Sequence, residues 1–410
     1  MDRIAAIKGR EILNAKGRPT VEAQLITERG IHVTASVPSG TSRGKYEAFE
    51  LYDGETRHNG RGARKAAENI STEICRALAG MDVADQEAID QTLCRLDGTP
   101  DKHRLGGNAL LAASVAAAKA GAASTNQPVY RYLGQKDIRP ALPDILATVI
   151  AGGVFSTSGM EFEDYMAVFH GFSSFPEELD ALCELRFSLE KALRGCYGDF
   201  PEDGGALAAP CASSREAFRW ILDTARSLGY AGNVSLGLDV AASELWEPDR
   251  GVYRMGENRY LSASQMISYY RGLCGEFPLT LIEDGLDQDD FNGFAELSGA
   301  LPGVQIVGDD LFATNPERLR RGIERRSANA VLLKINQIGT VTEAIKTART
   351  ASENGMDVIV SLRSGETADD FIADLAVAVG ARQIKLGSPV RMERNVKYNR
   401  LLEIWQELGM

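Results

Sequence analysis

Six short apolar segments in the second half of the chain each lead into a charged residue, and this pattern constrains the fold more than any other feature. The segments are SLGLDVAAS, LTLIEDGL, VQIVGDDL, AVLLKINQ, DVIVSLRSGE and RQIKLGS, and their charged residues are Asp239, Glu283, Asp309, Lys334, Arg363 and Lys385. These residues are 44, 26, 25, 29 and 22 positions apart. All but the first interval fit one strand, one loop, one helix and one return, which is the period of an α/β barrel. Continuous Val, Ile and Leu runs are typical of parallel strands buried on both faces.

In such a barrel the chemistry takes place at the carboxyl ends of the strands, so we expect the six charged side chains to converge on one mouth. Three carboxylates beside two lysines and an arginine suit a divalent metal that neutralises an anionic substrate, with one amine left to act as a base. Ordinary ion pairs would account for one such residue. Six of them at barrel spacing favour a functional site.

The bulk composition excludes several classes of partner. With 410 residues, 44% apolar and 25% charged, the chain is long enough for two soluble domains. The net charge of −12 argues against nucleic acid or an acidic membrane as a partner, because both repel a negative protein. The start, MDRIAAIKGR, is too charged for a signal peptide, and the longest apolar run, Ala109 to Ala118, is too short to span a bilayer. We therefore expect a cytoplasmic protein that binds a small molecule.

The cysteines and histidines are too scattered to suggest a site of their own. The six cysteines show no CxxC pair, so free thiols are expected rather than disulfides or zinc ligands. The four histidines form no HxxxH or HxH pattern, and neither GxSxG nor a P-loop occurs. A histidine metal site and a Ser/His/Asp hydrolase are both disfavoured.

Two domains are expected from the change in periodicity along the chain. Residues 1–126 predict a small α+β domain, with alternating strands up to Val37, a Gly-rich loop from Pro38 to Gly44 and helical periodicity from about Gly60. Three prolines predict a linker over 127–143. The barrel domain, 144–410, is expected to begin with strands over 145–153 and 160–168, followed by an amphipathic helix over 176–194.

Long motifs, in this order, resemble the enolase family over essentially the whole chain. In the first half they are REILNAKGRPTVEAQL, VPSGTSRGKYEAFELYDG, KAAENI and LDGTPDKHRLGGNALLAASVAAAKA. In the second half they are LDVAASE, IEDGL, QIVGDDLFATN, LLKINQIGT, LRSGETADDFIADLAVA, QIKLGS and ERNVKYNRLLEI. The resemblance implies an enolase-type eight-stranded α/β barrel, preceded by a small α+β cap domain that carries a mobile loop. It also implies a homodimer or an assembly of dimers.

The matched positions imply a magnesium site. Asp239, Glu283 and Asp309 match the ligands of the family's higher-affinity Mg²⁺. Ser39 matches the loop serine that closes over a second Mg²⁺, which arrives with the substrate.

Other matched positions imply how the substrate is handled. Lys334 matches the base that removes the C2 proton of 2-phosphoglycerate, and Lys385 matches the lysine that binds the substrate carboxylate. Arg363 and Ser364 match the phosphate-binding pair. A lysine base working with Mg²⁺ on such a proton is the combination for which the enolase superfamily is itself the standard example. We expect Lys385 and Mg²⁺ to lower the pKa of Lys334 towards neutrality by repulsion between like charges.

The chain departs from the family's motifs on the leaving-group side. The family's N-G-G-x-H reads Ala151 to Phe155 here, and in H-R-S-G-E-T the histidine is replaced by Leu362. The family's Q-E becomes Glu163-Asp164, and the catalytic glutamate of D-E-G-G becomes Asp203. Asp203 and Asp164 are therefore the candidate acids, and Glu163, Phe155 and Leu362 are candidate substrate-pocket residues. Loss of a general acid costs roughly 10²–10⁴-fold in rate.

Three interpretations remain open at this point. The first is an Mg²⁺-dependent dehydratase acting on 2-phosphoglycerate. The second is a paralogue in specialised metabolism that acts on a small phosphorylated or phosphono carboxylate, such as a carboxyphosphonoenolpyruvate synthase of phosphonate or phosphinate biosynthesis. Arg43, in the mobile loop, would suit an added negative charge there. The third is a catalytically silent binding protein, which the intact acids and lysines disfavour.

Overall fold

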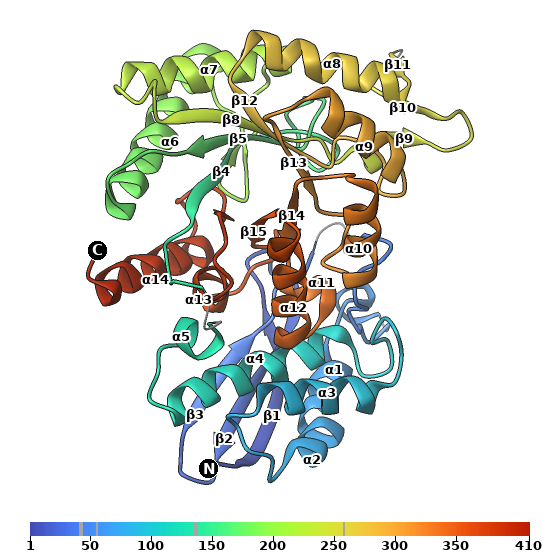
Figure 1. Ribbon diagram of the computed structural model, residues 1–410, viewed down its shortest axis with the longest axis vertical. Helices are drawn as coiled ribbons and strands as arrows, with labels where there is room; N and C mark the ends of the chain where they lie inside the picture. The colour runs from blue at the N-terminus through green and yellow to red at the C-terminus, as the bar shows by residue number, and fades with distance from the viewer. Residues whose placement is uncertain (41–43, 55, 135–137, 257–258) are drawn as a thin grey trace.

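The computed structural model describes residues 1–410 except 41–43, 55, 135–137 and 257–258. The chain forms a small N-terminal α+β domain, blue to cyan at the bottom of Figure 1, and an α/β barrel above it. The C-terminal helix α14 (Met392–Leu408) returns to the side of the barrel near α6 (Phe175–Tyr197). Among the described residues, no helix combines the length and the apolar character that crossing a bilayer requires.

The N-terminal domain is a three-stranded antiparallel sheet covered by helices. Its strands, in the order β1-β2-β3, are β1 (Ile4–Leu13), β2 (Pro19–Thr27) and β3 (His32–Ser36). Its helices are α1 (Arg64–Asn69), α2 (Cys75–Leu78), α3 (Gln86–Asp97) and α4 (Gly107–Ser124), with a π-helical segment (Ile70–Ile74) joining α1 to α2 and a 3-10 turn (Arg57–Gly60) before them.

Helix α4 lies between the two domains, and its apolar composition explains why it can be buried on both sides. It is built almost entirely from alanine, glycine and a few larger apolar residues, and nearly all of them are buried. One side contacts β2 and β3, and another contacts the barrel helices α11 (Ile335–Ile338) and α12 (Val341–Glu353). A helix that is apolar all round is buried on every side. The apolar run at Ala109 to Ala118 is therefore a domain-joining helix.

The barrel closes with eight strands. In ring order they are β4 (Asp144–Ala151), β5 (Asp164–Phe169), β8 (Val234–Asp239), β12 (Leu279–Glu283), β13 (Gln305–Gly308), β14 (Ala330–Leu333), β15 (Asp357–Ser361) and β16 (Gln383–Lys385), and β16 pairs with β4. The expected eight-stranded barrel is confirmed. Its interior is filled by side chains such as Met166, Leu281 and Leu332, as in other barrels of this size.

One strand corrects the expectation of parallel strands throughout. β5 pairs antiparallel with both β4 and β8, and it begins at Asp164 rather than at residue 160. The segment between β4 and β5, residues 152–163, contains no helix that would carry the chain back to the opposite end of the barrel. The first residue of β5 therefore lies at the same mouth as the last residues of its neighbours.

Helices surround the barrel, most of them following a strand. They are α6, α7 (Ser214–Ser227), α8 (Ala263–Glu276), α9 (Phe291–Ala300), α10 (Pro316–Arg325), α11, α12, α13 (Phe371–Ala378) and α14. Helices α6, α7, α8 and α12 each begin after a Ser or Thr whose hydroxyl accepts a backbone N–H of the first turn. Short strands occupy the connections: β6 (Glu202–Asp203), β7 (Ala206–Leu207), β9 (Trp246–Glu247), β10 (Val252–Arg254) and β11 (Tyr260–Leu261), with a 3-10 turn at Ala242–Glu244.

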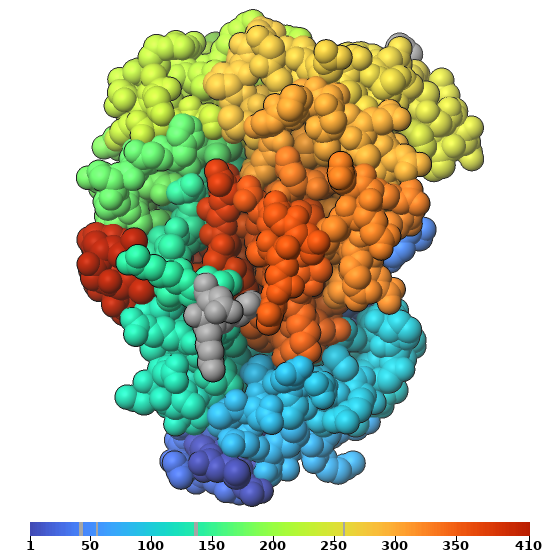
Figure 2. All heavy atoms as spheres, viewed as in Figure 1, coloured from blue at the N-terminus to red at the C-terminus, as the bar shows by residue number. Residues whose placement is uncertain are grey.

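The segment between the domains is partly helical. Residues 127–143, which the prolines predict to be a linker, contain α5 (Val129–Leu133). This helix packs on α4 and α13, and the backbone N–H of Tyr130 donates to Asp374 at 3.0 Å. The packed helix ties the end of the N-terminal domain to the barrel, and Figure 2 shows the two domains in contact along one face.

Candidate active site

A cavity of about 130 Å³ opens at the carboxyl ends of the barrel strands. Most of the residues predicted from the sequence line it, namely Phe155, Glu163, Asp164, Asp203, Asp239, Lys334, Leu362, Arg363, Ser364 and Lys385. A smaller cavity of about 40 Å³ adjoins it and adds Asp309. Glu283, at the end of β12, is fully buried beneath them. The tertiary structure thus brings together side chains that lie up to about 230 positions apart in the sequence.

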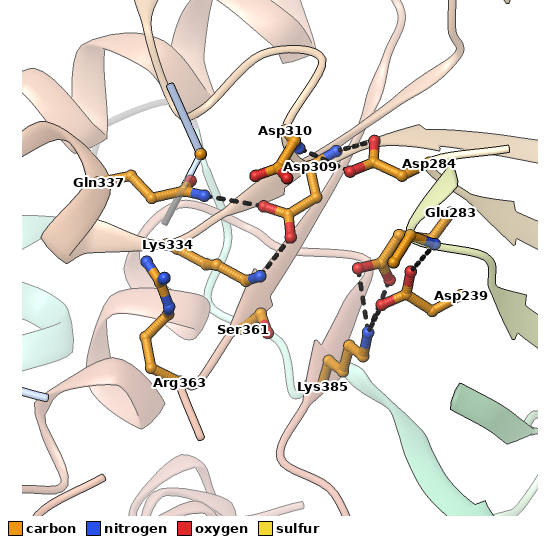
Figure 3. A network of polar contacts seen from close by, with 12 residues as sticks. Asp239, Glu283, Asp284, Asp309, Asp310, Lys334, Gln337, Ser361, Arg363 and Lys385 are labelled. Atoms are coloured by element: carbon orange, nitrogen blue, oxygen red, sulfur yellow. Dashed lines mark hydrogen bonds and ion pairs between the residues drawn. The ribbon is translucent and has the colours of Figure 1, made fainter. Parts of the chain in front are cut away.

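Lys385 is surrounded by carboxylates from three strands. Its Nζ lies 2.9 Å from Asp239 Oδ2, 2.9 Å from Glu283 Oε2 and 3.3 Å from Asp164 Oδ2. Figure 3 shows this ammonium group pointing at Asp239 and Glu283. Burial lowers the pKa of Lys385, but the surrounding acids raise it further, so the net pKa lies well above its ordinary value. Lys385 is therefore charged.

Lys334 pairs with a different carboxylate, that of Asp309. Its ammonium group forms a short ion pair with Asp309, whose other oxygen accepts Nε2 of Gln337 at 2.9 Å. Burial lowers the pKa of Lys334, but the charge of Asp309 outweighs it and leaves the pKa above its ordinary value. The lower pKa expected beside bound Mg²⁺ stays a prediction, because Asp309, which we assign to the metal, here attracts the lysine instead.

Two aspartates beside the predicted ligands were missed in the sequence. Asp284 accepts the backbone N–H groups of Asp309 at 2.9 Å and Asp310 at 2.7 Å, and so holds the turn that follows β13. Asp284, Asp309 and Asp310 also place carboxylate oxygens within 4.8 Å of one another. Burial first, and then the charge of Asp309, raises the pKa of Asp310 to about 7. The adjacent acidic pairs in IEDGL and VGDDL are the signal that could have revealed them.

The donor set of this mouth fits a hard divalent cation. Asp239, Glu283 and Asp309 offer only carboxylate oxygens, from three neighbouring strands. Burial and the charge of Asp239 raise the pKa of Glu283 well above its ordinary value. Buried carboxylates that repel one another require positive charge nearby, and the ammonium groups of Lys334 and Lys385 lie within ion-pair distance of them.

The N-terminal domain contributes Glu47 to the site, a residue that the sequence motifs did not predict. Glu47 forms a two-point ion pair with Arg363, at 2.9 Å to Nη1 and 3.2 Å to Nη2, and all of these groups are buried. Asn336 accepts from Arg363 Nη1 at 3.1 Å. The guanidinium assigned to phosphate binding thus already faces a carboxylate. Glu47 lies in the KYEAFE stretch, where its charge alone gave no signal.

One side of the cavity carries apolar side chains at the two positions where the family resemblance implies histidines. Phe155 is 37% exposed at the mouth, and Leu362 is 9% exposed behind it. Asp164 accepts the hydroxyl of Thr148 at 3.0 Å, and burial raises its pKa. Burial, together with Asp239 and Asp164, raises the pKa of the neighbouring Glu163 as well. A raised pKa brings a carboxyl group closer to the working range of a general acid.

Asp203 is held at the cavity by a buried arginine. It is the last residue of β6, and Arg186, fully buried on α6, donates to Gly205 O at 2.9 Å and to Glu202 Oε1 at 2.9 Å. Arg186 thereby fixes both sides of Asp203.

Ser39 does not line the cavity. Its hydroxyl accepts Nδ2 of Asn14 at 2.6 Å, and its backbone pairs with Gly365 in the loop after β15. Its assignment to the second Mg²⁺ stays a prediction. The loop's other serine, Ser42, and Arg43 lie outside the described residues.

Comparison with known proteins agrees with this geometry. The model of the enolase N-terminal domain matches residues 4–133, and that of the enolase C-terminal TIM barrel domain matches residues 140–410. A protein named enolase from Rubrobacter xylanophilus is 46% identical over 416 residues, covering 100% of this chain and 96% of the relative. Enolases from Methanopyrus kandleri and Methanocaldococcus jannaschii are 45% and 43% identical, with 97% and 96% of each relative covered.

Proposed function

Because the chain belongs to the enolase family and is a carbon–oxygen lyase, we propose that it removes the α-proton beside a carboxylate and expels a β-hydroxyl, with Mg²⁺, from 2-phosphoglycerate or a close analogue. The observation that carries the proposal is the pairing of two lysines with buried acids at one barrel mouth. Lys385 faces Asp239 and Glu283, while Lys334 faces Asp309.

The proposed cofactor is Mg²⁺, with a second ion arriving with the substrate. Asp239, Glu283 and Asp309 would hold the first ion. When bound, Mg²⁺ would supply the positive charge that stabilises the doubly negative intermediate formed by proton loss beside a carboxylate.

Lys334 is the proposed base. It accepts a proton only in its neutral form, so the pairing with Asp309 must be relieved before it can act. Lys385 stays protonated among its acids and binds the substrate carboxylate. Arg363 and Ser364 lie on the wall proposed for the phosphoryl group.

An aspartate is the proposed acid for the leaving hydroxyl. Asp164 is buried at the mouth with a raised pKa, and Asp203 reaches the same cavity from the end of β6. Either carboxyl group would donate a proton to the departing oxygen.

A second candidate function is supported by the apolar wall. Phe155 and Leu362 offer no side-chain hydrogen bond where the family has histidines. This favours a substrate that differs from 2-phosphoglycerate at its phosphoryl end, as in carboxyphosphonoenolpyruvate synthesis. We also propose a cytoplasmic homodimer or assembly of dimers, on the family resemblance alone.

Turnover of 2-phosphoglycerate tests the proposal directly. The assay follows formation of the enol phosphate by ³¹P NMR with Mg²⁺ and again after its removal by a chelator. Product formed only with Mg²⁺ supports the proposed reaction. Equal product formation after chelation would show that the reaction does not need Mg²⁺. Absence of both turnover and C2-hydrogen exchange would contradict the proposed activity on 2-phosphoglycerate and leave only the family membership.

A further inference from the structure

Gln337 connects the metal half of the site to the phosphoryl half. It lies on α11, three residues after Lys334, and it is only 1% exposed. Its Nε2 donates to Asp309 Oδ1 at 2.9 Å and, at the longer distance of 3.4 Å, to Glu47 Oε1. Figure 3 shows the amide pointing at Asp309. One side chain therefore contacts both a proposed metal ligand and the carboxylate that holds Arg363.

The orientation of this amide is fixed by its neighbours. Ionised carboxylates only accept hydrogen bonds, so the NH₂ end of the amide must face Asp309 and Glu47. The other end, Oε1, accepts the hydroxyl of the buried Thr314 at 2.7 Å. The backbone is held as well, because Gln337 O accepts the N–H of Ala48 at 2.7 Å. Gln337 therefore cannot turn away from Asp309 without breaking buried hydrogen bonds.

This contact gives the two oxygens of Asp309 different surroundings. Oδ1 accepts the amide of Gln337, whereas Oδ2 accepts the ammonium group of Lys334. An N–H group directed at Oδ1 presents the positive end of its dipole, which repels a metal cation from that oxygen. The ammonium group at Oδ2 is itself a cation, and another cation can take its place. Asp309 therefore offers a metal ion one oxygen rather than two.

The number of oxygens that a carboxylate offers affects which cation it binds best. Mg²⁺ is small and demands a compact octahedral set of oxygens. Ca²⁺ is larger, takes about six to eight oxygens in a flexible arrangement, and often binds both oxygens of one carboxylate. A carboxylate restricted to one oxygen therefore disfavours Ca²⁺ more than Mg²⁺.

We propose that Gln337 is a positioning residue that restricts Asp309 to one available oxygen and thereby favours Mg²⁺ over Ca²⁺. The inference rests on the proposed function, in which Asp309 is a metal ligand, and deepens it by naming a residue that determines which cation is held. Replacing a residue that orients a metal ligand typically changes metal affinity by about 10–100-fold. Without Gln337, a site for Mg²⁺ loses an oriented ligand, whereas a site for Ca²⁺ gains a second oxygen.

Titration calorimetry with magnesium chloride and with calcium chloride, in the absence of substrate, tests the inference. Gln337→Met keeps the length of the side chain and removes the amide, and the Thr314 hydroxyl still has Lys334 O as an acceptor at 3.3 Å. We expect Mg²⁺ affinity to fall about tenfold or more and Ca²⁺ affinity to fall much less or to rise. The ratio of the two affinities should therefore fall by about tenfold. A purely structural role would weaken both cations equally and leave the ratio unchanged.

A matched control is available at the opposite end of the barrel. Gln305, the first residue of β13, also donates its Nε2 to an aspartate, Asp357, at 2.8 Å. Gln305→Met should leave both affinities unchanged. If Gln337→Met does not fold, Gln337→Leu decides the question.

The possible outcomes separate this inference from the proposed function. An unchanged or increased ratio of Mg²⁺ to Ca²⁺ affinity in the Gln337 variant would overturn the inference alone. A parent that binds no Mg²⁺ would overturn it together with the proposed cofactor. Because cation binding requires neither substrate nor turnover, loss of C2-hydrogen exchange alone would contradict the proposed function and leave the role of Gln337 standing.

Discussion

Asp164 and Asp239 lie opposite each other in the antiparallel pairing of β5 and β8, and Lys385 neutralises both. A carboxylate at the start of one strand and one at the end of its neighbour share a mouth only because these strands run in opposite directions. The candidate acid and a candidate metal ligand are thereby placed around a single ammonium group.

The first prediction concerns the metal. Asp239→Asn removes a negative oxygen donor from the buried set, so we expect Mg²⁺ affinity to fall at least about tenfold and turnover to be abolished. Titration calorimetry measures the affinity. Asp223→Asn, an exposed aspartate on α7, is the control and should bind as the parent does. Unchanged affinity in Asp239→Asn would exclude this residue as a ligand.

The second prediction concerns the base. Lys334→Ala should slow exchange of the C2 hydrogen of 2-phosphoglycerate with solvent deuterium by roughly 10²–10⁴-fold, because no other proposed base reaches that proton. NMR follows the exchange without requiring dehydration. Lys191→Ala, an exposed lysine on α6, should exchange at the parent rate. Exchange at the parent rate in Lys334→Ala would disprove the assignment.

The third prediction concerns specificity. We expect kcat for 2-phosphoglycerate to lie at least about 10²-fold below the median enzyme value of about 10 s⁻¹, because the histidine donors are absent. Loss of donors that act in the transition state should lower kcat and kcat/KM together. Combining Phe155→His, Leu362→His, Asp164→Glu and Asp203→Glu should raise kcat by about tenfold or more.

A control variant distinguishes a gain in kcat caused by the restored site residues from a general effect of adding histidine. Phe187→His changes an exposed residue on α6 and should leave kcat as it is. A parent kcat of ordinary size would return the protein to the first interpretation, a dehydratase of 2-phosphoglycerate.

The fourth prediction concerns stability and pH. Glu178 on α6 is buried and accepts the backbone N–H of Ile145 at 2.6 Å, and burial raises its pKa from 4.5 to about 7. The folded state therefore holds this proton more tightly than the unfolded state. The stability gained is complete below about pH 4.5 and is lost as the pH rises through about 7.

Glu178→Gln keeps the acceptor oxygen and cannot ionise. We expect the variant to be more stable than the parent at pH 8, by up to about 3 kcal/mol, with the two converging towards pH 5. Urea unfolding at both pH values measures the difference. Glu184→Gln, exposed on the same helix, should show no such pH-dependent gain.

Much of the barrel could be predicted because each strand carries its own local signal. Continuous apolar runs ending at Asp239, Glu283 and Lys385 coincide with the ends of β8, β12 and β16. Burial on both faces requires such runs whatever the rest of the chain does. Four of the cavity residues, Asp239, Lys334, Arg363 and Lys385, could be named in advance for the same reason, since strand ends in a barrel share a mouth. The other six were named from the family resemblance.

Other features depend on contacts between distant segments, which the local pattern does not encode. The direction of β5 follows from how residues 152–163 return, and it decides that Asp164 faces Asp239. Glu47 acquires its role only where the N-terminal domain packs against Arg363, and the pKa of Lys334 depends on which charge lies nearest it. Asp284 likewise holds the turn after β13 through backbone contacts that only folding creates.

The barrel, its charged mouth and the kinds of group available there follow from the amino-acid sequence, because strand burial and residue chemistry are local properties. The tertiary structure alone decided which charges neutralise one another. Coulomb interactions and desolvation depend on distances and burial that arise when segments hundreds of residues apart meet.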